Sequence, residues 1–158
     1  MNGIQYIHKK QSGKGLTSIL ILLSVLAALA GCSAGRGDWK YEFTNGYVID
    51  RVNGHSIVIA YQEAPASTAK QIVIPCFFVT DFCSNDQYIG LKGIHTQGLS
   101  ASDEELKNGK QVYYLIDILS KEVFGPFEEE TTYLEQCETL NVGEMGEWFS
   151  TSDPGSFL

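Results

Sequence analysis

The chain has 158 residues, of which 44% are hydrophobic and 19% are charged, and its eleven basic and nineteen acidic side chains give a formal net charge of −8. This length fits one domain, and the hydrophobic fraction is that of a folded globular protein, which argues against wholesale disorder. The acidic balance argues against a nucleic-acid-binding protein, because neutralising phosphates requires a basic surface.

The N-terminal segment has the pattern of a lipoprotein signal peptide. Residues 1–15 carry three lysines and no acid, and residues 16–30 carry no charge. The uncharged stretch is shorter than the about 20 apolar residues of a transmembrane helix and fits an export signal. It ends in Leu-Ala-Gly-Cys, which resembles the lipobox of bacterial lipoproteins, where the cysteine is acylated and the peptide is cut just before it. We therefore expect removal of residues 1–31 and lipidation of Cys32 with palmitate-type chains.

Cleavage at this point sets the expected domain organisation and location. The mature chain would keep eight basic and nineteen acidic residues, a net charge of −11. Two acyl chains suffice for stable membrane attachment, whereas anionic lipid repels an acidic domain. Residues 32–38 would then tether a single globular domain, residues 39–150, and residues 151–158 would be a flexible tail. The expected location is the outer face of the cytoplasmic membrane, or the outer membrane in a cell that has one.

The first half of the domain shows β patterns. Residues 39–43 form a short aromatic run. Asn53-Gly54 separates two alternating apolar stretches, 47–52 and 55–61. This pair predicts a hairpin, because a type I′ turn needs positive φ at both central positions. Residues 71–79 predict a buried strand in which Pro75 marks a bulge or a free edge.

The second half adds strands and one helix. A turn is expected at 81–86, a strand at 88–92, and a long loop at 93–110. Residues 111–118 and 122–124 predict a hairpin that ends at Gly125-Pro126.

Residues 128–141 predict the one helix of the domain. Its apolar stripe would be Tyr133, Cys137 and Leu140. The expected fold is therefore α+β and mostly antiparallel, with six or seven strands in a small sheet, sandwich or barrel-like arrangement and one C-terminal helix.

No pattern predicts catalysis, a metal or a cofactor. Two histidines follow the lipobox, His55 and His95. The expected hairpin register makes Asp50 a diagonal neighbour of His55, a weak candidate polar pair that no serine or cysteine nucleophile accompanies. The Cys and His spacing does not fit zinc, and the acidic residues do not follow a calcium loop.

The tyrosines allow two interpretations. Tyrosines on an exposed sheet face could bind peptide or glycan, but tyrosine is equally common in half-buried strands. Those on or beside predicted strands are Tyr41, Tyr47, Tyr61, Tyr88, Tyr113 and Tyr114.

Three cysteines remain after the lipobox, and export places them where disulfides persist. They allow three single pairings or none. Cys76 is expected to be a small buried hydrophobe of its strand, Cys83 lies in a predicted turn, and Cys137 lies on the helix stripe. These positions favour a Cys83–Cys137 bridge, and the absence of any bridge is the alternative.

Several phrases together resemble a known family. They are GDWKYEF, NGYVIDR, SIVIA, DFCSNDQYIGLK, QVYYLIDILSKEVFGPF and EQCETLNV. The set is similar to a family of small Gram-positive lipoproteins known only as domain of unknown function 3997, over about residues 30–150. The resemblance implies an exported, anchored domain and brings no activity or site residues with it.

These features predict a non-enzymatic lipoprotein of the cell envelope that binds a protein, peptide or wall component. The alternative is an inhibitor or immunity-type protein that binds a basic secreted hydrolase or toxin, since the acidic charge would speed encounter with such a partner.

Overall fold

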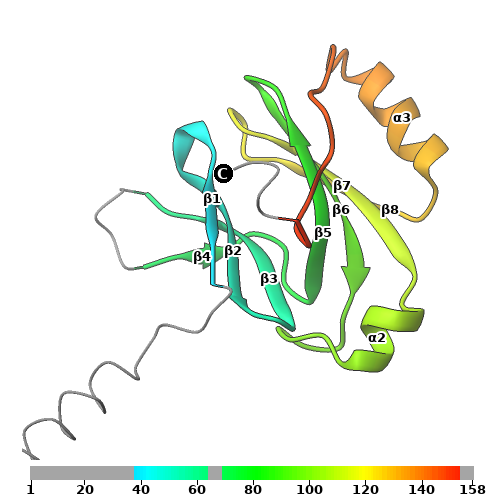
Figure 1. Ribbon diagram of the computed structural model, residues 1–158. Coiled ribbons are helices and arrows are strands. Elements are labelled where there is room, and N and C mark those ends of the chain that lie inside the picture. The colour runs from blue at the N-terminus through cyan, green and yellow to red at the C-terminus, as the bar shows by residue number, and fades with distance from the viewer. Residues whose placement is uncertain (1–37, 64–68, 154–158) are drawn as a thin grey trace, which may run out of the picture. The chain divides into compact units, whose positions relative to one another are not determined.

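The computed structural model describes residues 38–63 and 69–153, which form two antiparallel β-sheets and two α-helices (Figure 1). The four-stranded sheet has the order β1-β2-β3-β4, with β1 Lys40–Glu42, β2 Tyr47–Asn53, β3 Ser56–Tyr61 and β4 Gln71–Ile72. The five-stranded sheet has the order β8-β7-β6-β5-β9, with β5 Phe77–Ser84, β6 Tyr88–His95, β7 Gln111–Asp117, β8 Val123–Phe127 and β9 Phe149–Ser150. Neither sheet closes into a barrel. The helical segments are the 3₁₀ turn η1 Thr44–Gly46, α2 Asp103–Asn108 and α3 Glu130–Thr139. The mostly antiparallel α+β class is confirmed.

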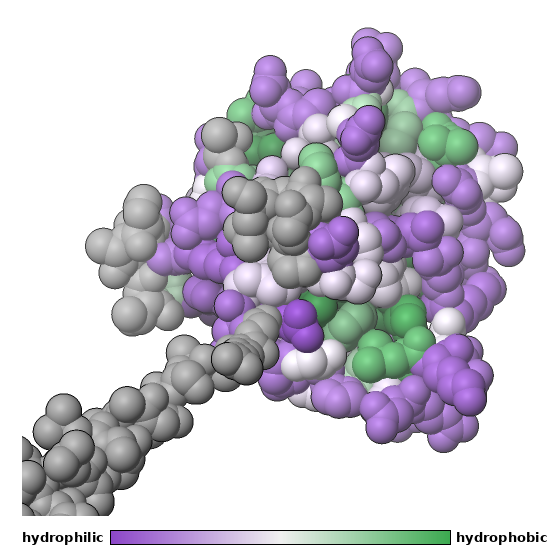
Figure 2. Space-filling view, viewed as in Figure 1, coloured by the Kyte–Doolittle hydropathy of each residue, from purple (hydrophilic) through white to green (hydrophobic). Residues whose placement is uncertain are grey.

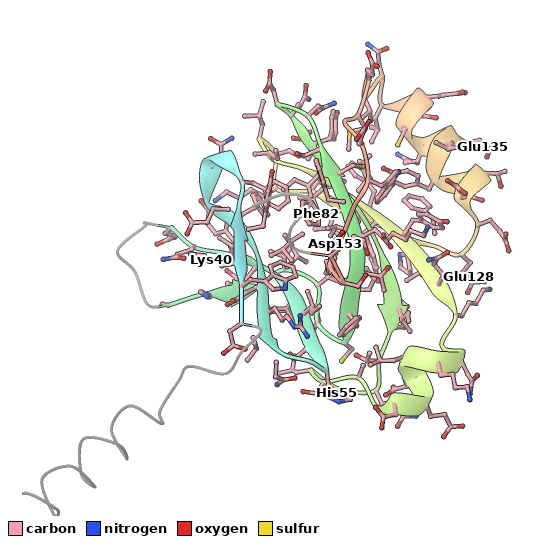
Figure 3. The ribbon with its side chains drawn as sticks, viewed as in Figure 1. Lys40, His55, Phe82, Glu128, Glu135 and Asp153 are labelled. Atoms are coloured by element: carbon pink, nitrogen blue, oxygen red, sulfur yellow. The ribbon has the colours of Figure 1, made fainter. Side chains whose placement is uncertain are left out.

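The main core lies between the inner faces of the two sheets. Alternation along β2 and β3 turns Ile49 and Ile59 inward, against Leu91 and Ile116 of the five-stranded sheet. Phe82 of β5 is 1% exposed and packs against the rings of Tyr41, Phe43 and Phe149 (Figure 3). Burying an aliphatic or aromatic side chain of this size contributes about 1.5–3 kcal/mol.

Helix α3 covers the other face of the five-stranded sheet. Its Tyr133 is buried and stacks on Tyr113 of β7 with ring centroids 5.5 Å apart. Cys137 and Leu140 pack against the same cluster, which confirms the predicted apolar stripe. The helix ends earlier than expected because Asn141 takes positive φ, and Val142 N–H then bonds the Cys137 carbonyl.

The predicted strand 71–79 is wrong as a single element. Its first residues belong to β4 and its last belong to β5, so the chain passes from one sheet to the other around Pro75. Cys76 takes φ 55° in this crossing. The strand β5 then continues to Ser84, through residues expected to form a turn. Proline without an N–H is compatible with such a crossing, where no ladder partner is available.

The predicted loop 93–110 contains a helix. Strand β6 runs on to His95, and α2 begins after Ser102. Ser102 and Glu105 form a reciprocal capping box. The Ser102 hydroxyl accepts a hydrogen bond from the Glu105 N–H, and the Glu105 carboxylate accepts one from the Ser102 N–H. Such a cap stabilises a six-residue helix that buries no residue of its own.

Two strand boundaries also differ from expectation. Strand β8 continues through Gly125-Pro126, because it is an edge strand where a missing N–H is tolerated. Strand β9 was not expected, and the following Thr151 is 3% exposed, with its hydroxyl donating to backbone carbonyls of β5. The chain therefore remains part of the fold beyond residue 150.

The surface is mainly polar. Figure 2 shows the visible face as largely hydrophilic, with hydrophobic areas that are separate from one another. Within the described residues, no helix is both long enough and apolar enough to span a bilayer.

Candidate functional site

Cys32, the predicted lipidation site, lies outside the described residues, as do residues 1–31 and most of the tether.

The structure does not bring Asp50 and His55 together. An irregularity between Arg51 and Asn53 shifts the hairpin register, so Asp50 faces Val58 rather than Ile57. Asp50 pairs with Lys70 on the outer face of the four-stranded sheet. The expected polar pair is therefore wrong. A bulge shifts the two-residue turn from Asn53-Gly54 to Gly54-His55, and neither Asn53 nor Gly54 takes the positive φ of the expected type I′ turn.

His55 takes part in a different contact. Its Nδ1 lies 3.1 Å from the Ala101 carbonyl oxygen and 3.8 Å from Asp103 Oδ1, while Ala101 N–H donates to the His55 carbonyl. These bonds tie the β2–β3 turn to the segment that precedes α2. The role of His55 here is to hold a loop.

His95 lies at the end of β6, beside the core. Its Nε2 is 3.0 Å from the Tyr114 hydroxyl, and both rings pack against Phe77. Burial raises the pKa of the Tyr114 phenol, so this hydroxyl keeps its proton at neutral pH and can donate it to His95.

The three described cysteines are free thiols, so the expected Cys83–Cys137 bridge is not formed in the structure. The two residues do lie near each other, because both thiols are beside the buried Tyr133 hydroxyl, which forms no well-formed hydrogen bond. Gly90 makes room for this cluster, since a Cβ there would lie 2.5 Å from Tyr133 Oη and 2.7 Å from Cys83 Sγ. Burial raises the pKa of the Cys83 thiol to about 12.

The tyrosines do not form an exposed binding face. Tyr47, Tyr88, Tyr113 and Tyr114 are buried in the two cores. Tyr61 is half-buried, and the Lys121 ammonium lies 4.2 Å from its ring centroid. The packing interpretation therefore holds for these four side chains.

Among the described residues, an open groove of about 520 Å³ lies at the edge of the four-stranded sheet, and we name it the Lys40 groove. Its lining is Lys40, Glu42, Phe43, Asn45, Gly46, Val48, Tyr61, Gln62 and Glu63.

Both polar and apolar groups are available in the Lys40 groove. Lys40 Nζ lies 3.3 Å from Gln62 Oε1 and 2.5 Å from Glu42 Oε1, so its charge is largely neutralised by a neighbour. The buried Val48 supplies an apolar floor. Such a surface can hold a polar chain segment through hydrogen bonds. It contains no nucleophile beside a base among its described lining residues.

Sequence reasoning missed Lys40 and Gln62. They are 22 residues apart and meet only because β1 and β3 both flank β2. No local spacing could have indicated this pairing. Within the described residues no group of three metal-ligating side chains is present.

A family model described as "Protein of unknown function (DUF3997)" matches residues 44–146, which is most of the chain. The chain belongs to this family. Neither a curated protein nor a solved structure matches it. The DUF3997 match begins at η1 and ends after α3, so it covers both layers of the fold and leaves out only β1 and β9 among the strands.

Proposed function

We propose that this DUF3997 protein is a membrane-anchored lipoprotein outside the cytoplasm, held by acyl chains on Cys32. The observation that carries the proposal is the sequence Leu-Ala-Gly-Cys at the end of a charge-free stretch that follows three lysines. A cleaved export signal combines these features, and two acyl chains give stable attachment to a bilayer.

The domain itself would act as a non-enzymatic binding module for an envelope protein, peptide or wall component. The Lys40 groove supports this role because it offers hydrogen-bonding groups around an apolar floor. The two described histidines support it as well, since each is engaged in a contact that holds the fold.

Fractionation of cells that express Cys32→Ala tests the anchor. Wild-type protein should sediment with membranes and be released by detergent, whereas the variant should be soluble or remain as an uncleaved precursor. Cys76→Ala, which also loses one thiol, is the matched control and should fractionate like wild type. Normal processing and normal membrane recovery of Cys32→Ala would refute the proposal.

A second candidate is an inhibitor or immunity-type protein for a basic secreted hydrolase or toxin. Residues 128–147 contain seven glutamates and no basic residue, and all seven are exposed. Glu128 and Glu135, labelled in Figure 3, lie in this region. An acidic surface attracts a basic partner and speeds association.

Salt dependence separates the two candidates. A complex with a basic exported protein that dissociates at high salt, and that the variant Glu135→Gln/Glu138→Gln weakens, supports the inhibitor role. Retention on isolated cell wall that neither salt nor this variant changes supports the binding module.

A further inference from the structure

Arg51 lies in a pocket of about 360 Å³ that is separate from the Lys40 groove. The pocket is lined by Arg51, Gly54, Ile57, Phe78, Thr80, Ser150, Thr151 and Ser152. Its walls therefore come from the β2–β3 hairpin of one sheet and from β5, β9 and the segment after β9 of the other sheet. Guanidinium Nη2 of Arg51 lies over the hairpin turn, 3.9 Å from where a Cβ on Gly54 would be.

The charge of Arg51 is not matched by a carboxylate. The Arg51 Nε is buried without a hydrogen-bond partner, and no ion pair within the described residues includes its guanidinium. Three of the six described lysines are in ion pairs, Lys40 with Glu42, Lys70 with Asp50 and Lys110 with Glu128, and Arg51 is the one cation that lines this pocket. An arginine that lines a pocket and forms no ion pair with a described acid is available for an anion that comes from outside.

The opposite wall presents hydroxyl groups at defined positions. Thr151 is fixed to β5 by bonds from its hydroxyl to the carbonyls of Val79 and Thr80, at 3.0 and 2.9 Å. This anchor sets the positions of Ser150 and Ser152, whose hydroxyls are 2.9 Å apart. Only one proton is used in the bond between two hydroxyls, so the pair keeps a second proton that can be donated to a ligand.

We propose that this pocket binds a carboxylate carried on a small apolar group, such as the C-terminal residue of a peptide. The planar guanidinium of Arg51 matches a carboxylate with two parallel hydrogen bonds, and the serine pair can supply a further donor. Ile57 and Phe78 provide an apolar wall for the remainder of the ligand.

A single unpaired cation suits a monoanion better than a phosphate dianion, which the net charge of −8 would repel. The inference rests on the proposed binding role and names the ligand class of that role, whereas the anchor at Cys32 is tested separately.

Nuclear magnetic resonance of the full-length chain in detergent micelles gives a direct readout. Arg36 and Arg51 are the only arginines, so Arg36→Lys removes the other signal and assigns the Arg51 Nε–H without any change in the pocket lining. N-acetyl-leucine should shift this signal in a saturable way. N-acetyl-leucinamide, which lacks the carboxylate, should not, and inorganic phosphate should bind more weakly than N-acetyl-leucine.

Variants then test the site by calorimetry with N-acetyl-leucine. Arg51→Gln should weaken binding at least about tenfold, as expected for loss of a charge-assisted pair. Arg51→Lys should weaken it less, and Ser150→Ala/Ser152→Ala should also reduce it. Lys110→Gln removes the same charge at the opposite side of the five-stranded sheet and should leave binding unchanged.

Several results would overturn the proposal. In the NMR titration, these are an Arg51 signal that does not move at millimolar N-acetyl-leucine, an equal shift with N-acetyl-leucinamide, or tighter binding of phosphate. In calorimetry, it is an equal loss of affinity in Arg51→Gln and Lys110→Gln. Because the wild-type signal is read without any mutation, an unfolded variant would not remove the test. Failure here with normal anchoring would leave the lipoprotein assignment standing.

Discussion

Cys83 is 1% exposed and lies next to Tyr133, which is also buried. Burial raises the pKa of the Cys83 thiol to about 12 and raises the pKa of the Tyr133 phenol as well. Both groups are therefore neutral at physiological pH. A protonated, inaccessible thiol is a poor nucleophile, which makes Cys83 a packed core residue rather than a reactive one.

Alkaline pH should destabilise the fold through these two groups. Each binds its proton more tightly in the folded state than in the unfolded state, so their contribution is complete below the unfolded pKa values and is lost as pH rises. We expect the free energy of unfolding to be constant up to about pH 9 and then to fall by roughly 1 kcal/mol per pH unit from Cys83 alone. Urea unfolding at a series of pH values measures this slope.

Two variants assign the alkaline slope to its source. Cys83→Ala should flatten the slope, and adding Tyr133→Phe should flatten it further. Tyr133→Phe alone should cost little at neutral pH, because the hydroxyl it removes has no well-formed hydrogen bond. Cys76→Ala, outside this cluster, should keep the wild-type slope, and an equal slope in Cys83→Ala would refute the explanation.

At the scale of elements, close contact between β5 and β6 depends on Gly93. The Phe77 ring lies directly over this residue, and a Cβ there would be 2.2 Å from the Phe78 carbonyl oxygen and 2.6 Å from the Phe77 ring. The absence of a side chain thus allows the aromatic group of Phe77, Tyr114 and His95 to pack at the end of the core.

Gly93→Ala should destabilise the protein by about 1–3 kcal/mol, the usual cost of overpacking. Gly98→Ala is the matched control, because nothing lies within 4 Å of the added Cβ. The difference between their midpoints in chemical unfolding measures the effect. Equal stability of the two variants would show that the strands separate without cost.

An element can be predicted from the sequence when the residues that determine it are close together along the chain. The β2–β3 hairpin is predicted by Asn53-Gly54, and α3 by the spacing of Tyr133, Cys137 and Leu140, because in both cases neighbours along the chain carry the information. The capping box of α2 is also visible in the sequence, as Ser102 three residues before Glu105, inside a polar segment whose composition favours a loop.

Other features depend on partners far along the chain. The crossing at Pro75 has the sequence of a single apolar strand because apolar residues continue through it, from β4 of one sheet to β5 of the other. The surroundings of Arg51 could not be predicted, since they join β2 to a segment about 100 residues later that becomes an edge strand only in the folded chain. The pairing of Asp50 with Lys70 likewise joins residues that are 20 positions apart in the sequence.

At the scale of the whole molecule, the fold bears on what the domain binds, whereas the proposed anchor bears on where the protein is located. The two sheets carry the Lys40 groove and the Arg51 pocket, which share no lining residue. The acidic charge gives the domain no attraction for anionic lipid, so the membrane attachment that we propose rests on acyl chains alone. The proposal as a whole therefore depends on the chemistry at Cys32.

Mass spectrometry of the protein purified from membranes tests this dependence most directly. We predict that the mature chain begins at Cys32 and that its N-terminal peptide carries a diacylglycerol group on the sulfur. A chain that begins at another residue, or an N-terminal peptide with an unmodified Cys32, would contradict the account.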